Sequence, residues 1–393
     1  MADVKIGIIS FYNNGNFGSS LQAFALHETI KDLNFTPVYI TVRENRGIKG
    51  HLIKLMRLFD LVCRHLRNPT LIKRTVNLVT LSRSLPRLPE ETKRLIQLFV
   101  DEHINYRFMS RRDLRASARN AEYLAFICGS DQIWSPNMIE CPGHMYLQFA
   151  PRRKRIAYAP SVGVIRMPKH NAKVLMKRIS QIEHLSVRES TSRVMIKEYT
   201  RRVADVVLDP TLLVPQSFWI DKLKGVPKQE HGNYILCYFL SEVTDNQVRY
   251  VENLSRRNNL GVVVVPYKNR ILGIDKSRHL TCGPMEFVSL VQGASIVCTD
   301  SYHGTLFSIN LNRPFLVFDR HEAEYLKQTS RIEHILSVTG LKGRMYRKTS
   351  ADIDFSEKIF SIDFTEANGI LVRERSRSMA FLTRAIRSVE GEK

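Results

Sequence analysis

The chain has 393 residues, more than one hydrophobic core usually serves, so we expect two domains. Its apolar and charged fractions, 44% and 25%, are typical of a folded protein and exclude a disordered or low-complexity chain. The formal net charge of +21 leaves three kinds of anionic partner open: nucleic acid, a membrane surface, or anionic substrates.

The amino terminus and the cysteines bear on the cellular compartment. The first residues lead directly into a strand-like apolar run without the pattern of a signal peptide, and no apolar run is long enough to span a bilayer. The six cysteines are scattered and include no Cys-x-x-Cys pair, which argues against a zinc site and for reduced thiols. We therefore expect a cytoplasmic protein that needs no metal.

The first 42 residues predict a βαβ unit. Residues 5–11 and 37–42 are apolar strands, and a helix over residues 21–33 separates them. The loop before this helix lacks the Gly-x-Gly-x-x-Gly spacing of a dinucleotide site, but the amino end of a helix with small residues can bind an anion. A tight turn whose glycines serve only the backbone is the alternative. The candidate anion-binding or acceptor-binding residues here are Asn14, Gly15, Asn16, Gly18 and Ser19.

Residues 46–115 interrupt the alternation of strands and helices and predict a basic helical insertion. From Arg43 to Arg115 the chain carries 17 Lys and Arg against 7 Asp and Glu, and the first part, residues 51–66, is apolar as well as basic. Such a helix can lie in the interface of an anionic membrane. An insertion packed on its own domain with a solvated basic face is the alternative.

Three further turns follow strands of the first half. Residues 123–128 form a strand that ends in Gly129-Ser130-Asp131, where Asp131 is a candidate base and Ser130 a candidate acceptor-binding or anion-binding residue. The turn at 159–163 offers Ser161 and Gly163 for the same role. Arg188 ends the strand at 184–187 and can bind a carboxylate or phosphate bidentately, or form an ion pair with the adjacent helix instead.

We place the domain boundary after Asp209-Pro210-Thr211. A linker-type loop follows at 222–232, then strands at 234–240 and 261–266 with a helix between them. The tail from residue 366 predicts a basic helix that packs back across both domains.

Residues 295–318 carry the densest group of reactive side chains. An apolar strand at 296–298 leads into a polar elbow over 299–304, then a short helix and another apolar strand at 315–318. Ligands of such sheets bind at the carboxyl ends of the strands, so His303 is placed to face a ligand. A helix cap or a satisfied polar residue is the alternative for this histidine.

Taken in order, these segments resemble the polysaccharide pyruvyl transferase family. The matching segments are Gly15-Asn16-Phe17-Gly18-Ser19-Ser20-Leu21-Gln22, Gly129-Ser130-Asp131-Gln132-Ile133-Trp134, Ala159-Pro160-Ser161-Val162-Gly163, Leu185-Ser186-Val187-Arg188-Glu189, Leu208-Asp209-Pro210-Thr211 and Asp300-Ser301-Tyr302-His303-Gly304.

The resemblance implies an α/β fold of two Rossmann-like domains that face each other across a cleft, similar to the GT-B architecture of glycosyltransferases. We expect residues 1–213 to form the acceptor-side domain, 214–365 the donor-side domain, and 366–393 the terminal helix. The implied activity moves a pyruvyl group from phosphoenolpyruvate, the donor substrate, to two hydroxyls of a sugar, which leaves a cyclic ketal. It implies no separate cofactor.

The same resemblance suggests roles for the site residues. Arg188 would hold the donor together with residues 301–304, His303 would act as acid and phosphate partner, and Asp131 would deprotonate the attacking hydroxyl. The family has Arg-Leu-His where this chain has Ser301-Tyr302-His303 followed by Gly304, so one cation is missing. The basic cluster 152–155 and Lys268 are candidates to replace it.

Three functions remain open at this stage. The first is a pyruvyl transferase of capsular or exopolysaccharide assembly; its acceptor, where lipid-linked, would favour peripheral contact with an anionic membrane at the inner face of the cytoplasmic membrane. The second is a nucleotide-sugar glycosyltransferase on the same scaffold. The third is a basic nucleic-acid-binding protein, but no recognition motif supports it, so we expect no nucleic-acid partner.

Overall fold

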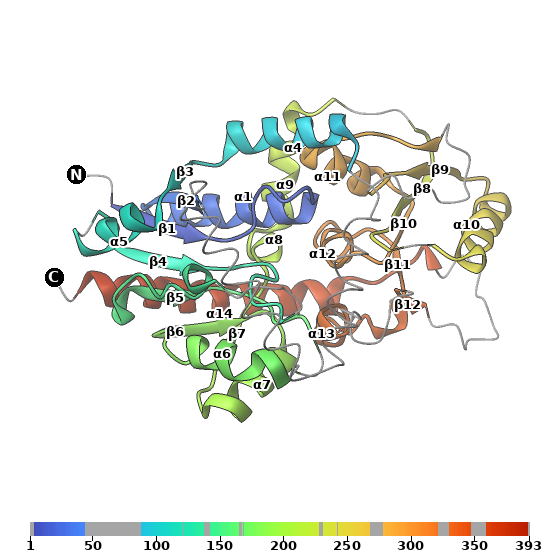
Figure 1. Cartoon of the computed structure of the whole chain (residues 1–393). Helices are drawn as coiled ribbons and strands as arrows, with labels where there is room; N and C mark the ends of the chain where they lie inside the picture. The colour runs from blue at the N-terminus through green and yellow to red at the C-terminus, as the bar shows by residue number, and fades with distance from the viewer. Residues whose placement is uncertain are drawn as a thin grey trace, which may run out of the picture.

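The computed structural model describes residues 4–43, 88–120, 122–136, 142–164, 167, 169–227, 231–241, 243–267, 278–320, 330–346 and 359–391. In these residues two parallel β-sheets form the centres of two domains, with helices packed around each sheet (Figure 1). The apolar and basic stretch at 51–66 and the rest of the expected insertion up to residue 87 lie outside the described residues, as does Lys268.

The first sheet has seven parallel strands in the order β3-β2-β1-β4-β5-β6-β7. After β1 the chain builds the sheet outward in one direction through β2 and β3, and it then returns to the other side of β1 with β4. The pair β1 and β4 is therefore the topological switch point, where ligands of open α/β sheets bind. The strands are β1 Lys5–Ile9, β2 Thr36–Val42, β3 Tyr106–Met109, β4 Ala125–Cys128, β5 Arg155–Ala157, β6 His184–Val187 and β7 Asp205–Val206.

The second sheet has five parallel strands in the order β12-β11-β10-β8-β9, and β8 and β10 form its switch point. All residues of β8, β10 and β11 are buried, which agrees with the continuous apolar runs of a parallel sheet covered on both faces. The strands are β8 Tyr234–Tyr238, β9 Gly261–Val264, β10 Ile296–Thr299, β11 Phe315–Phe318 and β12 Met345–Tyr346. The two sheets confirm the expected α/β class with two Rossmann-like, GT-B-like domains.

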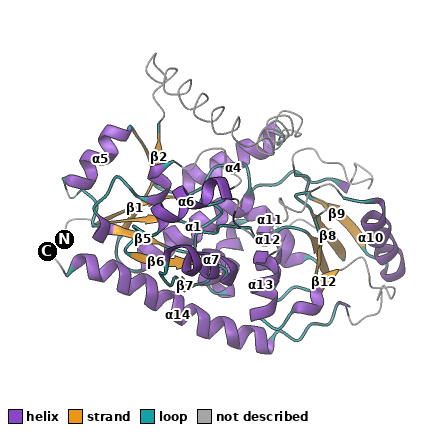
Figure 2. Ribbon diagram, turned by 60° about the horizontal axis from the view of Figure 1, so that its bottom comes forward, coloured by secondary structure: helices purple, strands orange, loops and turns teal. Residues whose placement is uncertain are grey.

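Helices connect the strands and cover the sheets (Figure 2). Among the described residues no helix is both long enough and apolar enough to cross a membrane. The helices are α1 Phe17–Asp32, α4 Glu90–His103, α5 Arg111–Arg119, α6 Lys169–Ile179, α7 Ser190–Thr200, α8 Pro210–Leu213, α9 Gln216–Lys222, α10 Asp245–Asn258, α11 Pro284–Gly293, α12 Tyr302–Asn310, α13 Ser330–Val338 and α14 Thr365–Glu390.

The described part of the expected insertion, residues 88–115, is not purely helical. It contains α4, strand β3 and the start of α5, and β3 pairs with β2 at the edge of the first sheet, with Tyr106 opposite Tyr39. Edge strands are exposed on one side, so the exposed Arg107 fits this position. The same residue makes the segment look like part of a basic helical stretch in the sequence. Residues 88–115 are thus part of the first domain's α/β layers.

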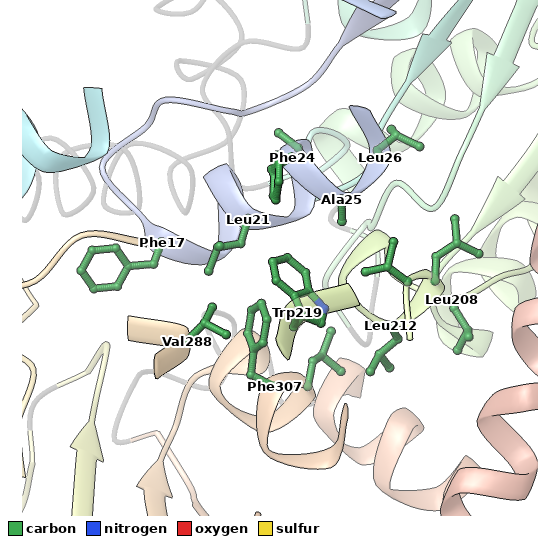
Figure 3. Packing of buried hydrophobic residues seen from close by; sticks show 14 of the residues in the cluster. Phe17, Leu21, Phe24, Ala25, Leu26, Leu208, Leu212, Trp219, Val288 and Phe307 are labelled. Atoms are coloured by element: carbon green, nitrogen blue, oxygen red, sulfur yellow. The ribbon is translucent and has the colours of Figure 1, made fainter. Parts of the chain in front are cut away.

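A continuous hydrophobic core joins the two domains around α1. Most of α1 is buried, because one side faces the first sheet and the other faces helices of the second domain. At its amino end Phe17 stacks on Phe287 of α11, with ring centroids 5.3 Å apart. Figure 3 shows this core, with Leu21 and Phe24 of α1 near Trp219 of α9. The amino end of α1 is thereby held against the second domain.

The long helix α14 extends beside both domains (Figure 2). Its Ser378 hydroxyl accepts a hydrogen bond from the Leu208 amide (2.9 Å) of the first domain. Its Arg375 donates to the Leu212 carbonyl (2.7 Å) and to the Asn310 side chain (2.9 Å) at the carboxyl end of α12 in the second domain. One helix therefore contacts both halves on the face that carries α8.

Candidate active site

A pocket of about 210 Å³ lies where the two switch points face each other. The first domain contributes residues that follow β1 and β4, and the second contributes residues that follow β8, β9, β10 and β11. The pocket is lined by Asn16, Ser19, Asp131, Gln132, Leu240, Tyr267, Ser301, Tyr302, His303, Arg320 and Arg331. Because both sheets are parallel, the carboxyl ends of their central strands converge on this one pocket.

The amino ends of two helices also meet at the pocket. Asn16 caps α1 and accepts from the Gly18 amide at 2.9 Å, while Ser301 caps α12 and accepts from the Gly304 amide at 3.3 Å. Gly18 lies so close to the His303 ring that a Cβ there would overlap the ring. Two helix amino ends, each with a partial positive charge, thus flank one pocket and favour an anionic ligand.

Arg188 is fully buried among carboxylates beside the pocket. Its Nη1 donates to Asp209 Oδ2 at 2.8 Å, its Nη2 lies 3.6 Å from Asp131 Oδ1, and its Nε lies 3.8 Å from Glu189 Oε2. Burial opposes its charge, but the Tyr302 oxygen and these three carboxylates raise the pKa of the guanidinium above its usual value. Arg188 does not line the pocket, and its ion pairs include Glu189 at the start of α7.

Asp131 faces the pocket from the turn after β4. Its Oδ2 accepts from the Ser19 hydroxyl at 2.6 Å and its Oδ1 accepts from the Gln132 amide at 2.7 Å. Burial alone would raise the pKa of this carboxyl, but the charge of Arg188 and the Ser19 hydrogen bond lower it, and protonated His303 acts in the same direction at acidic pH. Asp131 is consequently ionised at neutral pH, and its contact with Ser19 joins two motifs that are 112 positions apart in the sequence.

His303, in the first turn of α12, is 6% exposed and lines the pocket. Its Nε2 lies 3.8 Å from Asp209 Oδ2. Burial lowers its pKa to about 4; Arg188 and Arg331 act in the same direction, against the carboxylates of Asp209 and Asp131. The imidazole is therefore neutral at pH 7 and can accept a proton.

Asp209 is a site residue that the sequence reasoning quoted in a motif without assigning it a role. It caps α8 through Thr211, whose amide and hydroxyl both donate to Asp209 Oδ1, at 3.1 and 2.9 Å. Its other oxygen accepts from Arg188 and, at 3.2 Å, from the Ser130 hydroxyl. The sequence Asp209-Pro210-Thr211 is a typical helix start, which explains the capping role of Asp209. Its contacts with Arg188 and His303 depend on the tertiary structure and leave no local signal.

Three expected acceptor-binding residues support the site from behind the pocket. Ser130 donates to the Ala159 carbonyl (3.0 Å) as well as to Asp209. The Ser161 hydroxyl donates to Glu189 Oε1 at 3.0 Å, and the Gly163 amide donates to the same oxygen at 3.4 Å. These residues therefore hold Asp209 and Glu189, two of the three carboxylates that surround Arg188, and none of the three residues lines the pocket.

The remaining expected residues divide between the pocket and its rim. Asn14 is exposed and Gly15, with a φ of 76°, forms the turn before α1; neither lines the pocket. Gly304 lies in the first turn of α12 next to Thr299 and is likewise absent from the lining. The expected residues that do line it are Asn16, Ser19, Asp131, Ser301, Tyr302 and His303.

The basic cluster 152–155 does not supply the cation that the sequence lacks at position 301. Its residues precede or begin β5, so they lie at the amino edge of the first sheet, opposite the pocket. Arg152 pairs with Glu183 at 2.8 Å, and Arg155 donates to the Ala150 carbonyl at 2.9 Å. The guanidiniums that do line the pocket belong to Arg320 and Arg331, which sequence reasoning missed because no motif marks them.

Metal-ligating side chains are not grouped at this site. In the ranges that the structure describes, no three His, Cys, Asp or Glu side chains are arranged as ligands of a metal ion. The site instead combines buried carboxylates, a neutral imidazole and arginines, a set suited to proton transfer and to binding an organic anion.

Several solved structures resemble the chain at low sequence identity. A protein described as a UDP-N-acetylglucosamine 2-epimerase from Listeria monocytogenes has a TM-score of 0.49 at 9% identity, covering 98% of this chain and 91% of that one. S. aureus MnaA with UDP has 0.47 at 10% identity, covering 92% and 86%. MurG of Acinetobacter baumannii has 0.41 at 9% identity, covering 98% and 99%.

Sequence comparison is more specific than these structural likenesses. No curated protein sequence matches the chain. A family profile described as polysaccharide pyruvyl transferase matches residues 16–322, a range that begins at the cap of α1 and includes every residue that lines the pocket from Asn16 to Arg320. The resemblance of the ordered motifs is thereby confirmed, and the chain belongs to the polysaccharide pyruvyl transferase family, a family of enzymes.

Proposed function

We propose that the protein transfers the pyruvyl group of phosphoenolpyruvate to two hydroxyls of one sugar unit, which yields a cyclic ketal and inorganic phosphate. One observation carries this proposal: a small pocket between the domains places a buried neutral His303 beside an ionised Asp131 and two arginines, Arg320 and Arg331. The donor carries both phosphate and carboxylate, and arginines with two helix amino ends match that charge.

The reaction balances without a further reactant. The first sugar hydroxyl attacks C2 of the donor while C3 gains a proton and becomes a methyl group. The second hydroxyl then attacks C2, and the bond from C2 to the phosphate oxygen breaks. The proton of the first hydroxyl accounts for the new C3–H bond, and the proton of the second leaves with the phosphate.

His303 is our candidate for the proton transfer. Its low pKa leaves the imidazole neutral in the free protein, so it can accept the proton of the attacking hydroxyl. The bound donor anion and Asp209, 3.8 Å away, stabilise the resulting imidazolium, which can return the proton to C3. Asp131 already accepts a hydrogen bond from the Ser19 hydroxyl and pairs with Arg188, so we assign it the orientation of the hydroxyl as hydrogen-bond acceptor.

The size of the pocket favours this donor over a nucleotide sugar. Pockets that enclose drug-sized ligands measure roughly 300–1,000 Å³. The volume here is about 210 Å³, which suits a three-carbon phosphate better than a nucleoside diphosphate with its sugar. Part of the acceptor can remain outside the pocket, because only the two reacting hydroxyls must reach C2.

We further propose that the acceptor is a sugar of a capsular or exopolysaccharide repeat, carried in its lipid-linked form at the inner face of the cytoplasmic membrane. The basic residues of the segment from 46 to 87 support peripheral contact with anionic lipid, each contributing about 1 kcal/mol near the surface. Sedimentation with anionic vesicles should weaken after charge reversal of Lys54, Arg57 and Arg64. Charge reversal of three basic residues on α10 should leave the sedimentation unchanged. If the unmodified protein does not sediment with anionic vesicles, the membrane proposal is wrong.

The decisive experiment supplies the purified protein with phosphoenolpyruvate and a panel of oligosaccharide acceptors. We expect phosphate release that depends on the acceptor, and a product whose mass and nuclear magnetic resonance spectrum show a pyruvyl ketal. A parallel set of nucleotide sugars should give no transfer and no calorimetric binding in the same pocket. Binding of a nucleotide sugar without any binding of phosphoenolpyruvate would overturn the proposal in favour of a glycosyltransferase.

A further inference from the structure

The pocket contains a cation that no sequence motif marks. Arg331 is the second residue of α13, and it is 5% exposed although it lines the pocket. Burying a guanidinium costs several kcal/mol unless partners compensate its charge. Arg331 therefore places a cation at the wall of a pocket that two helix amino ends already make favourable to an anion.

Arg331 and Arg188 both contact the ring of Tyr302. The Arg331 Cζ lies 5.0 Å from the ring centroid and the Arg188 Cζ lies 4.5 Å from it. Each guanidinium gains a cation–π attraction from the ring. The Arg188 charge is also matched by three buried carboxylates, of which Asp209 is 2.8 Å away. Arg188 therefore supports the site from behind the pocket, while Arg331 faces the pocket.

The other cations raise the positive potential at Arg331. Burial lowers the pKa of Arg331 to about 9, and the charges of Arg188 and Arg320 lower it further than Glu189 and Asp131 raise it. Arg331 still carries its charge at neutral pH. The guanidiniums of Arg188 and Arg320 thus oppose the charge of Arg331, and a bound anion would relieve this repulsion.

Position 301 does not provide this charge. Ser301 caps α12 through its hydroxyl and faces the pocket as a small neutral residue. We propose that Arg331, supplied by α13 and oriented by the ring of Tyr302, binds the anionic end of the donor in place of an arginine at position 301. This inference rests on the proposed function for the identity of the donor, and it assigns the anion-binding role to a different element of the second domain.

The test compares Arg331→Gln and Arg331→Lys with Arg256→Gln. Arg256 is an exposed residue of α10 that donates to Asn253, so its replacement removes the same charge far from the pocket. Calorimetry with phosphoenolpyruvate should show that Arg331→Gln raises the dissociation constant about tenfold to a hundredfold, because a charge-assisted hydrogen bond is lost. Arg256→Gln should bind as the unmodified protein does.

Kinetics separates a donor-binding role from a structural one. In Arg331→Lys, which keeps the charge but lacks the fork of N–H donors, the KM for phosphoenolpyruvate should rise while the KM for the acceptor stays constant. Thermal melts identify any variant that fails to fold, and the lysine variant then decides the question. Equal donor affinity and equal donor KM in folded Arg331 variants would overturn the inference and leave the proposed function intact.

The opposite failure is also distinguishable. If the unmodified protein does not bind phosphoenolpyruvate, the proposed function fails, and titration with inorganic phosphate then tests the anion site alone. Phosphate binding that is lost in Arg331→Gln but kept in Arg256→Gln would support the site for another anionic donor. Phosphate binding that is unaffected by Arg331→Gln would overturn the site as well.

Discussion

The two domains contribute walls of different character to the active-site pocket. On the side of the first domain, the pocket-lining carboxylate of Asp131 and the carboxylate of Asp209 behind it are held by Arg188 and by hydroxyl donors. In the wall of the second domain, His303, Arg320 and Arg331 face the pocket. The first wall is a network of carboxylates paired with Arg188, whereas the second presents a neutral base and two arginines, of which Arg320 lies 3.7 Å from Asp300. Under the proposed function, the first domain would fix the geometry and the second would bind the anionic donor.

The largest expected effect comes from the second wall. His303→Gln removes the group that accepts and returns a proton, so we expect turnover to fall about 10²–10⁴-fold with little change in the free energy of unfolding. Steady-state assays of phosphate release check this. The control is His184→Gln, because His184 begins β6 at the opposite edge of the sheet and contacts Ser388 of α14. Near-normal turnover of His303→Gln would remove His303 from the chemistry.

The first wall should respond in stability instead. Arg188→Met leaves buried carboxylates uncompensated, and we expect a loss of about 3–5 kcal/mol in the free energy of unfolding. Urea denaturation measures it. The control is Arg152→Ala, whose pair with Glu183 is 60% and 43% exposed and should contribute about 0–1 kcal/mol. If the two variants lose equal stability, the first wall is not held together by its ion pairs.

Gly18→Ala tests the place where the two walls touch. A Cβ at this position would overlap the ring of His303, so α1 and α12 must separate or the ring must move. We expect a loss of about 1–3 kcal/mol in stability together with reduced turnover. A matched Gly369→Ala change in α14, where a Cβ meets little, should preserve both. Unchanged activity in folded Gly18→Ala would show that the contact is not needed for catalysis.

The smallest effect is a pH dependence of stability. The folded pKa of His303 is about 4 against an ordinary value of 6.5, so the unfolded chain binds more protons between these values, and stability rises with pH across that window. From pH 5 to pH 7 this group should contribute about 2 kcal/mol. Asp131 and Asp209 act in the same direction because their pKa values are lowered. Urea midpoints of His303→Gln should therefore show a flatter rise than the unmodified protein, and identical slopes would contradict the low pKa.

The sequence by itself determined the chain's α/β class and the places where strands end in polar turns. Apolar runs such as 125–128 and 296–299 are local signals, because a buried parallel strand is a continuous apolar segment that can be identified without knowing its neighbours in the sheet. The parallel arrangement then requires that residues after such strands meet at one edge. This edge argument applies to Ser19 and Asp131, which follow neighbouring strands of the first sheet; His303 follows a strand of the second sheet and joins them only through the two-domain cleft that the family resemblance implies.

The tertiary structure decided which charges face the pocket and which are buried behind it. Arg188 reads as a donor-binding residue in the sequence, yet its partners Asp131 and Asp209 come from turns 57 and 21 positions away, as the numbering shows. Arg331 shares the Tyr302 ring with Arg188 although Arg331 lies in α13 of the second domain and Arg188 follows β6 of the first. Such contacts depend on how two domains pack around α1, and no local pattern of residues encodes that packing.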